Sequence, residues 1–131
     1  MKVCEHRVTY DEIDGQKIVF NAHYLKWADR ALYEFFRAGG YPPVLLESIG
    51  MDLVVRKAVV EYVHPAYHDE QLIFYYDVTH IGHTSLRARI TIENEAEQLI
   101  TVIDMTYVNV IAGQKAEIPA NIRMFLQQVM E

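Results

Sequence analysis

The sequence predicts an α+β fold in which an antiparallel sheet of about five strands wraps around one long buried helix, with a short helix at the C-terminus. Two observations support this fold class. One stretch near the N-terminus has helical periodicity and is apolar over most of its circumference, and four segments rich in Val, Ile, Tyr and Thr follow it. A helix with such a broad apolar surface needs cover on several sides, and a curled sheet provides it.

A strand and an acidic loop precede the long helix. Residues 3–10 contain several residues that favour strands, such as Val3, Val8 and Tyr10, and they predict the first strand. The loop after this strand holds three acids just upstream of the positive end of the predicted helix: Asp11, Glu12 and Asp14.

The long helix is predicted over roughly residues 21–38. Asn21 is a favourable N-cap residue, and two glycines and two prolines within 39–43 form a strong stop signal. The apolar stripe is much wider than one narrow face, so the helix is expected to be largely buried. The stripe consists of Tyr24, Leu25, Trp27, Ala28, Ala31, Leu32, Phe35 and Phe36. Residues 42–50 predict one or two further helical turns that connect this helix to the sheet.

Four further strands are predicted one after another, at 51–65, 71–81, 85–94 and 99–111. Between Ser85 and Glu93, apolar residues alternate with arginine and threonine, which indicates an antiparallel sheet with one packed face and one wet face. The polar break at 93–98 has the length of a hairpin loop. The C-terminal segment predicts a short amphipathic helix that begins at Pro119.

Length and composition favour a single domain over residues 1–131 with one core. The net charge of -6 argues against nucleic acid as a partner. The only cysteine, Cys4, excludes an internal disulfide, and no apolar run reaches the ~18 residues needed to span a membrane, so the sequence predicts a cytoplasmic protein. A curled sheet with two free edges also predicts a homodimer or a homotetramer.

Two short patterns carry a family resemblance that extends over nearly the whole chain. The first begins in the acidic loop and runs into the helix, with the residues Tyr10, Glu12, Asp14, Ile18, Val19, Asn21, His23, Tyr24 and Trp27. The second, weaker pattern consists of Tyr62, Pro65, Ala66, Asp69 and Ser85. In both patterns the chain resembles the hotdog-fold thioesterases of the 4-hydroxybenzoyl-CoA thioesterase type, which include the acyl-CoA thioesterases associated with the Tol-Pal system.

The resemblance implies an acyl-CoA thioesterase that hydrolyses an acyl or aryl thioester to a free carboxylic acid, without a metal or another cofactor. Asp14 would act as a nucleophile or as a general base, and both roles stay open. The backbone N–H of Asn21, at the positive end of the helix, would polarise the thioester carbonyl. The residues expected to bind the substrate are His23, Tyr24, Lys57, His83 and Ser85.

Two positions depart from the family pattern. Lys17 stands where the family usually has a glycine, and Gly15 is expected to supply the backbone freedom instead. The stretch 80–85, which in some members carries a basic cluster for the phosphates of coenzyme A, offers only His80 and His83. An acyl-carrier-protein thioesterase, or a non-catalytic module that binds acyl groups or serves assembly, is therefore kept as the alternative.

The remaining candidates have simpler interpretations. Arg87 and Arg89 are expected on the wet face of their strand, either as solvated side chains or, together with Lys57 or His83, in contact with a phosphate or pantetheine group. Cys4 lacks the Cys/His surroundings of a nucleophile. The sequence has no G-x-S-x-G element, which excludes the α/β-hydrolase route to thioester cleavage.

Overall fold

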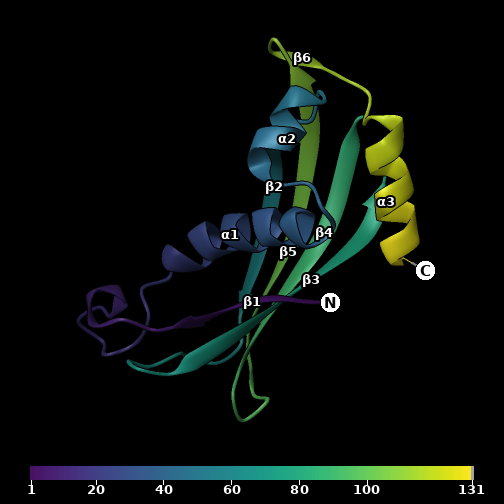
Figure 1. Cartoon of the computed structure of the whole chain (residues 1–131). Coiled ribbons are helices and arrows are strands. Elements are labelled where there is room, and N and C mark those ends of the chain that lie inside the picture. Colours follow the sequence, from purple (N-terminus) through teal and green to yellow (C-terminus); the bar gives the residue numbers. More distant parts are fainter. Residues whose placement is uncertain (131) are drawn as a thin grey trace.

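In the computed structural model, which describes residues 1–130, an antiparallel sheet curls around a central helix (Figure 1). The strands are β1 (Lys2–Arg7), β2 (Leu53–Tyr62), β3 (Gln71–Ile81), β4 (Ser85–Asn94), β5 (Leu99–Ile111) and β6 (Gln114–Lys115). They are arranged in the order β1-β3-β4-β5-β2, and β6 pairs with the end of β5. The predicted α+β class and the wrapped sheet are confirmed, whereas β6 was not predicted.

The central helix α1 (His23–Ala38) buries seven of the eight residues predicted for its apolar stripe, and only Leu25 is exposed. The helix begins at His23 with Ala22 at the N-cap, so the predicted cap at Asn21 is wrong. Asn21 lies in a preceding turn, where its carbonyl accepts the N–H of Tyr24 at 3.4 Å and the Phe20 carbonyl accepts the N–H of His23 at 3.1 Å. This turn delays the start of the helix by two residues.

The first strand ends earlier than predicted, at Arg7. The chain then leaves the sheet because Thr9 and Glu12 form a capping box around a short 3-10 helix at Tyr10–Glu12. The N–H of Thr9 donates to the Glu12 carboxylate at 2.8 Å. The acidic loop therefore starts as a hydrogen-bonded turn.

The later strands lie close to the predicted ranges. On β4 the alternation is confirmed, because Leu86, Ala88 and Ile90 are buried against the core while Arg87 and Arg89 are exposed. β2 ends at Tyr62, before the predicted position 65. The N–H groups of Val63 and His64 both donate to the carbonyl of Ile100, at 2.9 and 3.1 Å, and this shared acceptor ends the regular ladder.

β2 forms one edge of the sheet, and many of its side chains are exposed, including those of Val54, Val55 and Val59. An exposed apolar edge strand is a surface on which another strand can pair.

The short hairpin to β6 arises from Ala112 and Gly113, whose φ angles of 50° and 77° suit a two-residue turn between antiparallel strands.

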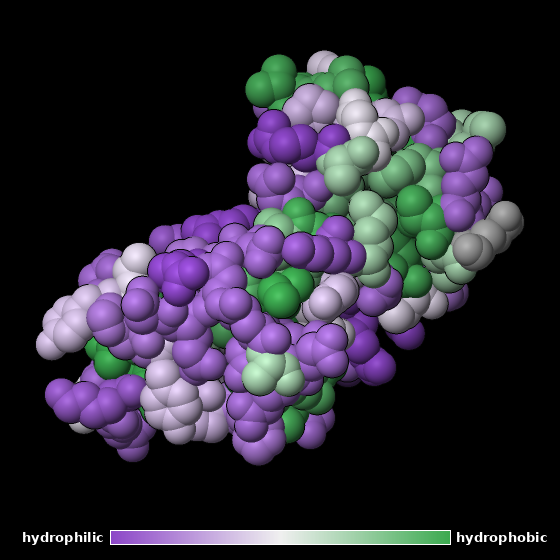
Figure 2. All heavy atoms as spheres, turned by 60° about the horizontal axis from the view of Figure 1, so that its bottom comes forward, coloured by the Kyte–Doolittle hydropathy of each residue, from purple (hydrophilic) through white to green (hydrophobic). Residues whose placement is uncertain are grey.

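Two short helices complete the fold, α2 (Pro43–Ser48) and α3 (Ala120–Met130). Phe125 of α3 packs against Phe35 and Phe36 of α1, with ring centroids 5.4 and 6.0 Å apart. Figure 2 shows hydrophobic side chains reaching the surface mainly on the side that carries α2 and α3, while the opposite end is largely hydrophilic. Within residues 1–130, no helix is long and apolar enough to cross a membrane.

Candidate active site

The loop after the 3-10 helix holds Asp14 at its base. Ile13 and Val19 form an isolated antiparallel bridge, and the N–H of Asp14 donates to the carbonyl of Ile18 at 3.0 Å. The side chain of Asp14 is partly buried, and its Oδ1 accepts the N–H of Gln16 at 2.7 Å. Among the described residues, no hydrogen bond uses Oδ2 of Asp14. One carboxylate oxygen is thus fixed and the other is available.

Lys17 gives this loop its shape. Its φ angle is 70°, and its N–H donates to the carbonyl of Asp14 at 3.0 Å. Gly15 has an ordinary backbone conformation, so the expectation that it would supply the missing freedom is wrong. Lysine itself adopts the left-handed conformation that favours glycine, at a cost of about 1 kcal/mol. The loop is therefore retained without the glycine.

A polar network anchors the acidic loop to β1 and α1. Nε2 of His6 lies 2.8 Å from Oε1 of Glu12, and Nη1 of Arg30 lies 3.2 Å from Nδ1 of His6. Because arginine can only donate, Nδ1 accepts and Nε2–H donates to the carboxylate. Burial alone would raise the pKa of Glu12, but hydrogen bonds from Thr9 and His6 outweigh it and lower that pKa. Glu12 is therefore committed to structure, which leaves Asp14 as the available acid.

The turn before α1 presents backbone donors. Within residues 1–130, the N–H groups of Asn21 and Ala22 take part in no hydrogen bond. The carbonyl of Asn21 accepts a hydrogen bond from the hydroxyl of Tyr62 at 3.3 Å, which ties the turn to the end of β2. Two free N–H groups at the positive end of a helix can stabilise negative charge on a ligand oxygen.

Asp14, Asn21 and Tyr24 line one pocket of about 390 Å³ between the loop, the start of α1 and the end of β2. Its other walls are mainly apolar and contain no lysine or arginine. They are formed by Gln16, Ile18, Val19, Tyr62, Val63, His64 and Pro65. Burial raises the pKa of Tyr24 to about 12, so its hydroxyl stays protonated at neutral pH. A carboxylate, free N–H donors and an apolar wall are the groups that acyl transfer requires.

The other residues predicted to bind the substrate lie outside the Asp14 pocket. The ring of His23 lies between Phe20 and Trp27, with centroids 6.2 and 6.0 Å apart, and does not line the pocket. Lys57 lies on the outer face of the sheet, in a separate hollow. Ser85 begins β4, and His83 is an exposed loop residue whose Nδ1 is 3.9 Å from the Glu117 carboxylate.

Sequence reasoning missed the network that His6 and Arg30 form around Glu12. The three residues come from β1, α1 and the loop, and no spacing pattern joins them. His64 was interpreted as a strand-end residue, and it lies just beyond β2 as a wall of the Asp14 pocket. The position of Tyr62 in the second family pattern was the one sequence signal for its contact with the turn at Asn21.

Comparison with known proteins finds a matching family model and curated relatives. The sequence model of the thioesterase-like superfamily matches residues 8–126. A curated relative, the acyl-CoA thioester hydrolase YbgC of Escherichia coli O6:H1, is 33% identical over 105 residues, which cover 75% of this chain and 78% of the relative.

Solved structures share the fold. A hypothetical protein from Thermus thermophilus superposes with a TM-score of 0.92 at 21% identity, covering 98% of this chain and 99% of the other. An aspartate-to-asparagine variant of 4-hydroxybenzoyl-CoA thioesterase, in complex with 4-hydroxybenzoyl-CoA, superposes with a TM-score of 0.86 at 19% identity, covering 94% of this chain and 96% of the other. These likenesses confirm the hotdog architecture.

Proposed function

The chain belongs to the thioesterase-like superfamily and is a thioester hydrolase, and we propose that its substrate is an acyl or aryl thioester of coenzyme A. The observation that carries the proposal is that the carboxylate of Asp14 borders the same largely apolar pocket as Asn21, whose N–H makes no hydrogen bond within residues 1–130. The name of the curated relative supports coenzyme A as the carrier. The product would be a free carboxylic acid.

In the proposed reaction, the thioester carbonyl oxygen accepts hydrogen bonds from the N–H groups at Asn21 and Ala22. These donors stabilise the negative charge that develops on the oxygen, and one such donor contributes about 3 kcal/mol to transition-state stabilisation. Their position at the start of α1 adds the positive end of the helix dipole. The carbonyl carbon would then lie within reach of Asp14.

Two roles for Asp14 are consistent with this arrangement. As a nucleophile, its carboxylate oxygen attacks the carbonyl carbon, the C–S bond breaks, the thiolate leaves, and water hydrolyses the resulting anhydride. As a general base, Asp14 removes a proton from water, and the hydroxide attacks the same carbon and displaces the thiolate. Both routes use the free Oδ2, because Oδ1 is fixed by Gln16.

A thioester of acyl carrier protein is the second candidate substrate. The absence of lysine and arginine from the walls of the Asp14 pocket favours it, because a carrier protein presents fewer phosphates than coenzyme A. The non-catalytic alternative was based on Lys17, and it loses support because Lys17 adopts the conformation that the loop needs.

We also propose that the protein forms a homodimer through the edge of β2, or a homotetramer built from two such dimers. β2 has unpaired backbone groups on its outer side and exposes Val54, Val55 and Val59. Two copies of one edge strand can pair antiparallel about a two-fold axis. In that pairing, the beginning of each β2 lies beside the end of the other, close to the partner's pocket.

A panel of acyl-CoA, aryl-CoA and acyl-carrier-protein thioesters tests the function, with released thiol as the readout. We expect wild type to hydrolyse at least one coenzyme A thioester and Asp14→Asn to lose at least a hundredfold in rate. Asp77→Asn, an exposed acid on β3, is the control and should retain the wild-type rate. Failure of wild type on every thioester would overturn the function, whereas full activity of Asp14→Asn would overturn only the site.

A further inference from the structure

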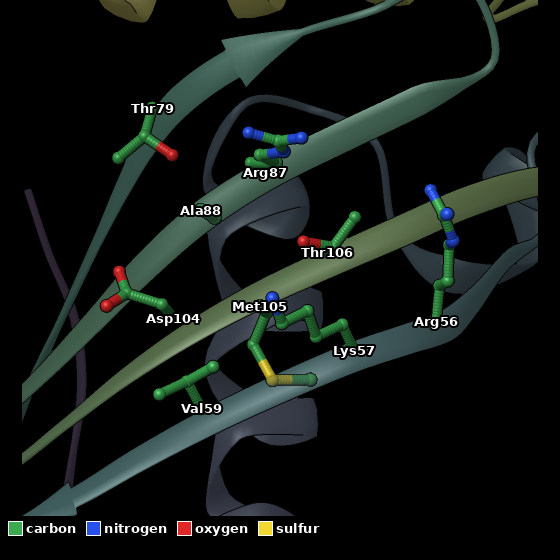
Figure 3. Close-up of a pocket in the computed structure, with 9 residues that line it drawn as sticks. All are labelled: Arg56, Lys57, Val59, Thr79, Arg87, Ala88, Asp104, Met105 and Thr106. Atoms are coloured by element: carbon green, nitrogen blue, oxygen red, sulfur yellow. The ribbon is translucent and has the colours of Figure 1, made fainter.

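A second hollow lies on the outer face of the sheet, the face turned away from α1. It has a volume of about 520 Å³, and Figure 3 shows side chains from β2, β3, β4 and β5 around it. Lys57 on β2, Thr106 on β5 and Arg87 on β4 occupy one row across the sheet, because Lys57 pairs with Thr106 and Thr106 pairs with Arg87. The row places two cations about 10 Å apart at the backbone, with a hydroxyl between them.

Two β-bulges flank this row, one on β2 and one on β3. On β2 the register shifts between Val55 and Lys57, which makes Arg56 the extra residue. On β3 the register shifts between Val78 and His80, which makes Thr79 the extra residue. Both extra residues line the hollow, and Figure 3 shows them on its two flanks. Bulges redirect side chains and are common beside binding sites.

Among the described residues, the cations of the hollow have no carboxylate partner. Within residues 1–130, no carboxylate oxygen lies within 4.0 Å of the charged nitrogens of Arg56, Lys57 or Arg87. The one acid in the wall, Asp104, is held by Arg89 through bonds of 2.9 and 3.3 Å. Three unpaired cations lie together in a protein whose net charge is -6, and their mutual repulsion is relieved when an anion binds between them.

We propose that Arg56, Lys57 and Arg87 bind the phosphate groups of the coenzyme A portion of the substrate, an inference that rests on the proposed function. Coenzyme A carries a 3′-phosphate and a pyrophosphate, whereas the Asp14 pocket has no lysine or arginine in its wall. The expected phosphate loop at 80–85 contributes no lysine or arginine either. Guanidinium groups with neighbouring hydroxyls match the oxygens of a phosphate.

The position of the hollow suits a substrate with two ends. β2 connects the two sites, because Lys57 borders the hollow and Tyr62 borders the Asp14 pocket. Lys57 and Tyr62 are five residues apart on β2, roughly 17 Å at 3.4 Å per residue, and because side chains alternate along a strand they face opposite sides of the sheet. A pantetheine arm that joins the two sites therefore passes around the end of β2, beside the Asp14 pocket. In a dimer that pairs β2 with β2, the same cations also approach the partner's pocket because the strands run in opposite directions.

Isothermal titration of the full chain with four ligands tests the site: coenzyme A, dephospho-coenzyme A, pantetheine and inorganic pyrophosphate. We expect Arg87→Gln to raise the dissociation constant of coenzyme A at least about tenfold, because the charge-assisted hydrogen bonds from the guanidinium to a phosphate are lost. Lys57→Gln should act in the same direction. Arg37→Gln is the matched control, because Arg37 is exposed at the end of α1 on the other side of the sheet. It should bind coenzyme A as wild type does.

Three results would overturn the site: unchanged coenzyme A binding by folded Arg87→Gln, equal weakening by Arg37→Gln, or equal weakening for pantetheine and coenzyme A. If Arg87→Gln weakens pyrophosphate but not coenzyme A, the hollow binds another phosphorylated molecule and the assignment to the substrate fails. If coenzyme A binding depends on Arg87 while wild type hydrolyses no thioester, the site stands and the proposed function fails.

Discussion

Nε2 of His6 donates a hydrogen bond to the carboxylate of Glu12, 2.8 Å away, and this contact joins the first strand to the loop that carries Asp14. Both side chains are mostly buried, with exposed fractions of 17% and 12%. Arg30 completes the connection by donating to the other ring nitrogen of His6. The loop is thus attached on one side to β1 and on the other to α1, which limits how far Asp14 can move.

Glu12→Gln should destabilise the protein in a pH-dependent way. The folded state lowers the pKa of Glu12 below its ordinary value of 4.5, so the stabilisation is present above that value and is lost as the pH falls through the lower folded-state pKa. At pH 7 we expect a loss of about 1.5 kcal/mol, because charge-assisted hydrogen bonds from Thr9 and His6 are weakened. Urea unfolding of both proteins between pH 3 and pH 7 measures the difference. A difference that stays constant over this range would show that the ionised carboxylate is not the cause.

Lys17 allows a test of backbone strain in the loop. At a φ angle of 70°, glycine is tolerated without strain and a β-branched residue is not. We expect Lys17→Val to be less stable than Lys17→Gly by at least about 1 kcal/mol, measured by thermal unfolding. Lys17→Gly should also keep thioesterase activity. Equal stability of the two variants would mean that the loop rearranges around position 17.

The pattern of the sequence was sufficient to predict the layers but not the contacts that shape the site. Helical spacing identified the buried face of α1, and alternation identified the packed face of β4, because both follow from local periodicity. The left-handed Lys17 is a single-residue conformation with no periodic signal. The His6 and Arg30 contacts join residues that are 24 positions apart, and only the assembled fold brings them together.

The thiol of Cys4 should react slowly with alkylating reagents. Burial, and to a lesser extent the nearby Glu34 carboxylate, raise its pKa to about 11 against the opposing effect of Arg30. Relative to the ordinary value of 9.0, about a hundredfold less thiolate is present at pH 8. Alkylation by iodoacetamide at pH 8 should therefore be about a hundredfold slower than in urea. Cys4→Ala should retain hydrolysis, and a large loss of kcat would reopen a role for the thiol.

A charge on the edge of β2 should prevent dimer formation. Val55 is 50% exposed on this edge, and a lysine there would oppose the pairing of two β2 strands. We expect Val55→Lys to sediment as a monomer at concentrations at which wild type is a dimer or a tetramer. Val44→Lys serves as the control, because Val44 is 82% exposed on α2 and away from the edge. A monomeric wild type, or a dimeric Val55→Lys, would exclude β2 as the interface.

Tyr62→Phe tests whether the turn before α1 positions the N–H groups that polarise the thioester. The Tyr62 hydroxyl donates to the carbonyl of Asn21 at 3.3 Å, and the phenylalanine keeps the ring that packs on Tyr24, whose centroid lies 5.6 Å away. Loss of this one exposed hydrogen bond is worth about 0.5–1 kcal/mol, so kcat should fall about two- to fivefold if the turn shifts.

The control for this prediction is Tyr67→Phe, since Tyr67 is similarly exposed and does not line the pocket. A donor that acts mainly in the transition state predicts equal losses in kcat and kcat/KM. A rise in KM alone would instead assign Tyr62 to substrate binding. Unchanged kinetics would show that the backbone bonds of His23 and Tyr24 hold the turn without help from β2, and the oxyanion donors would then depend on α1 alone.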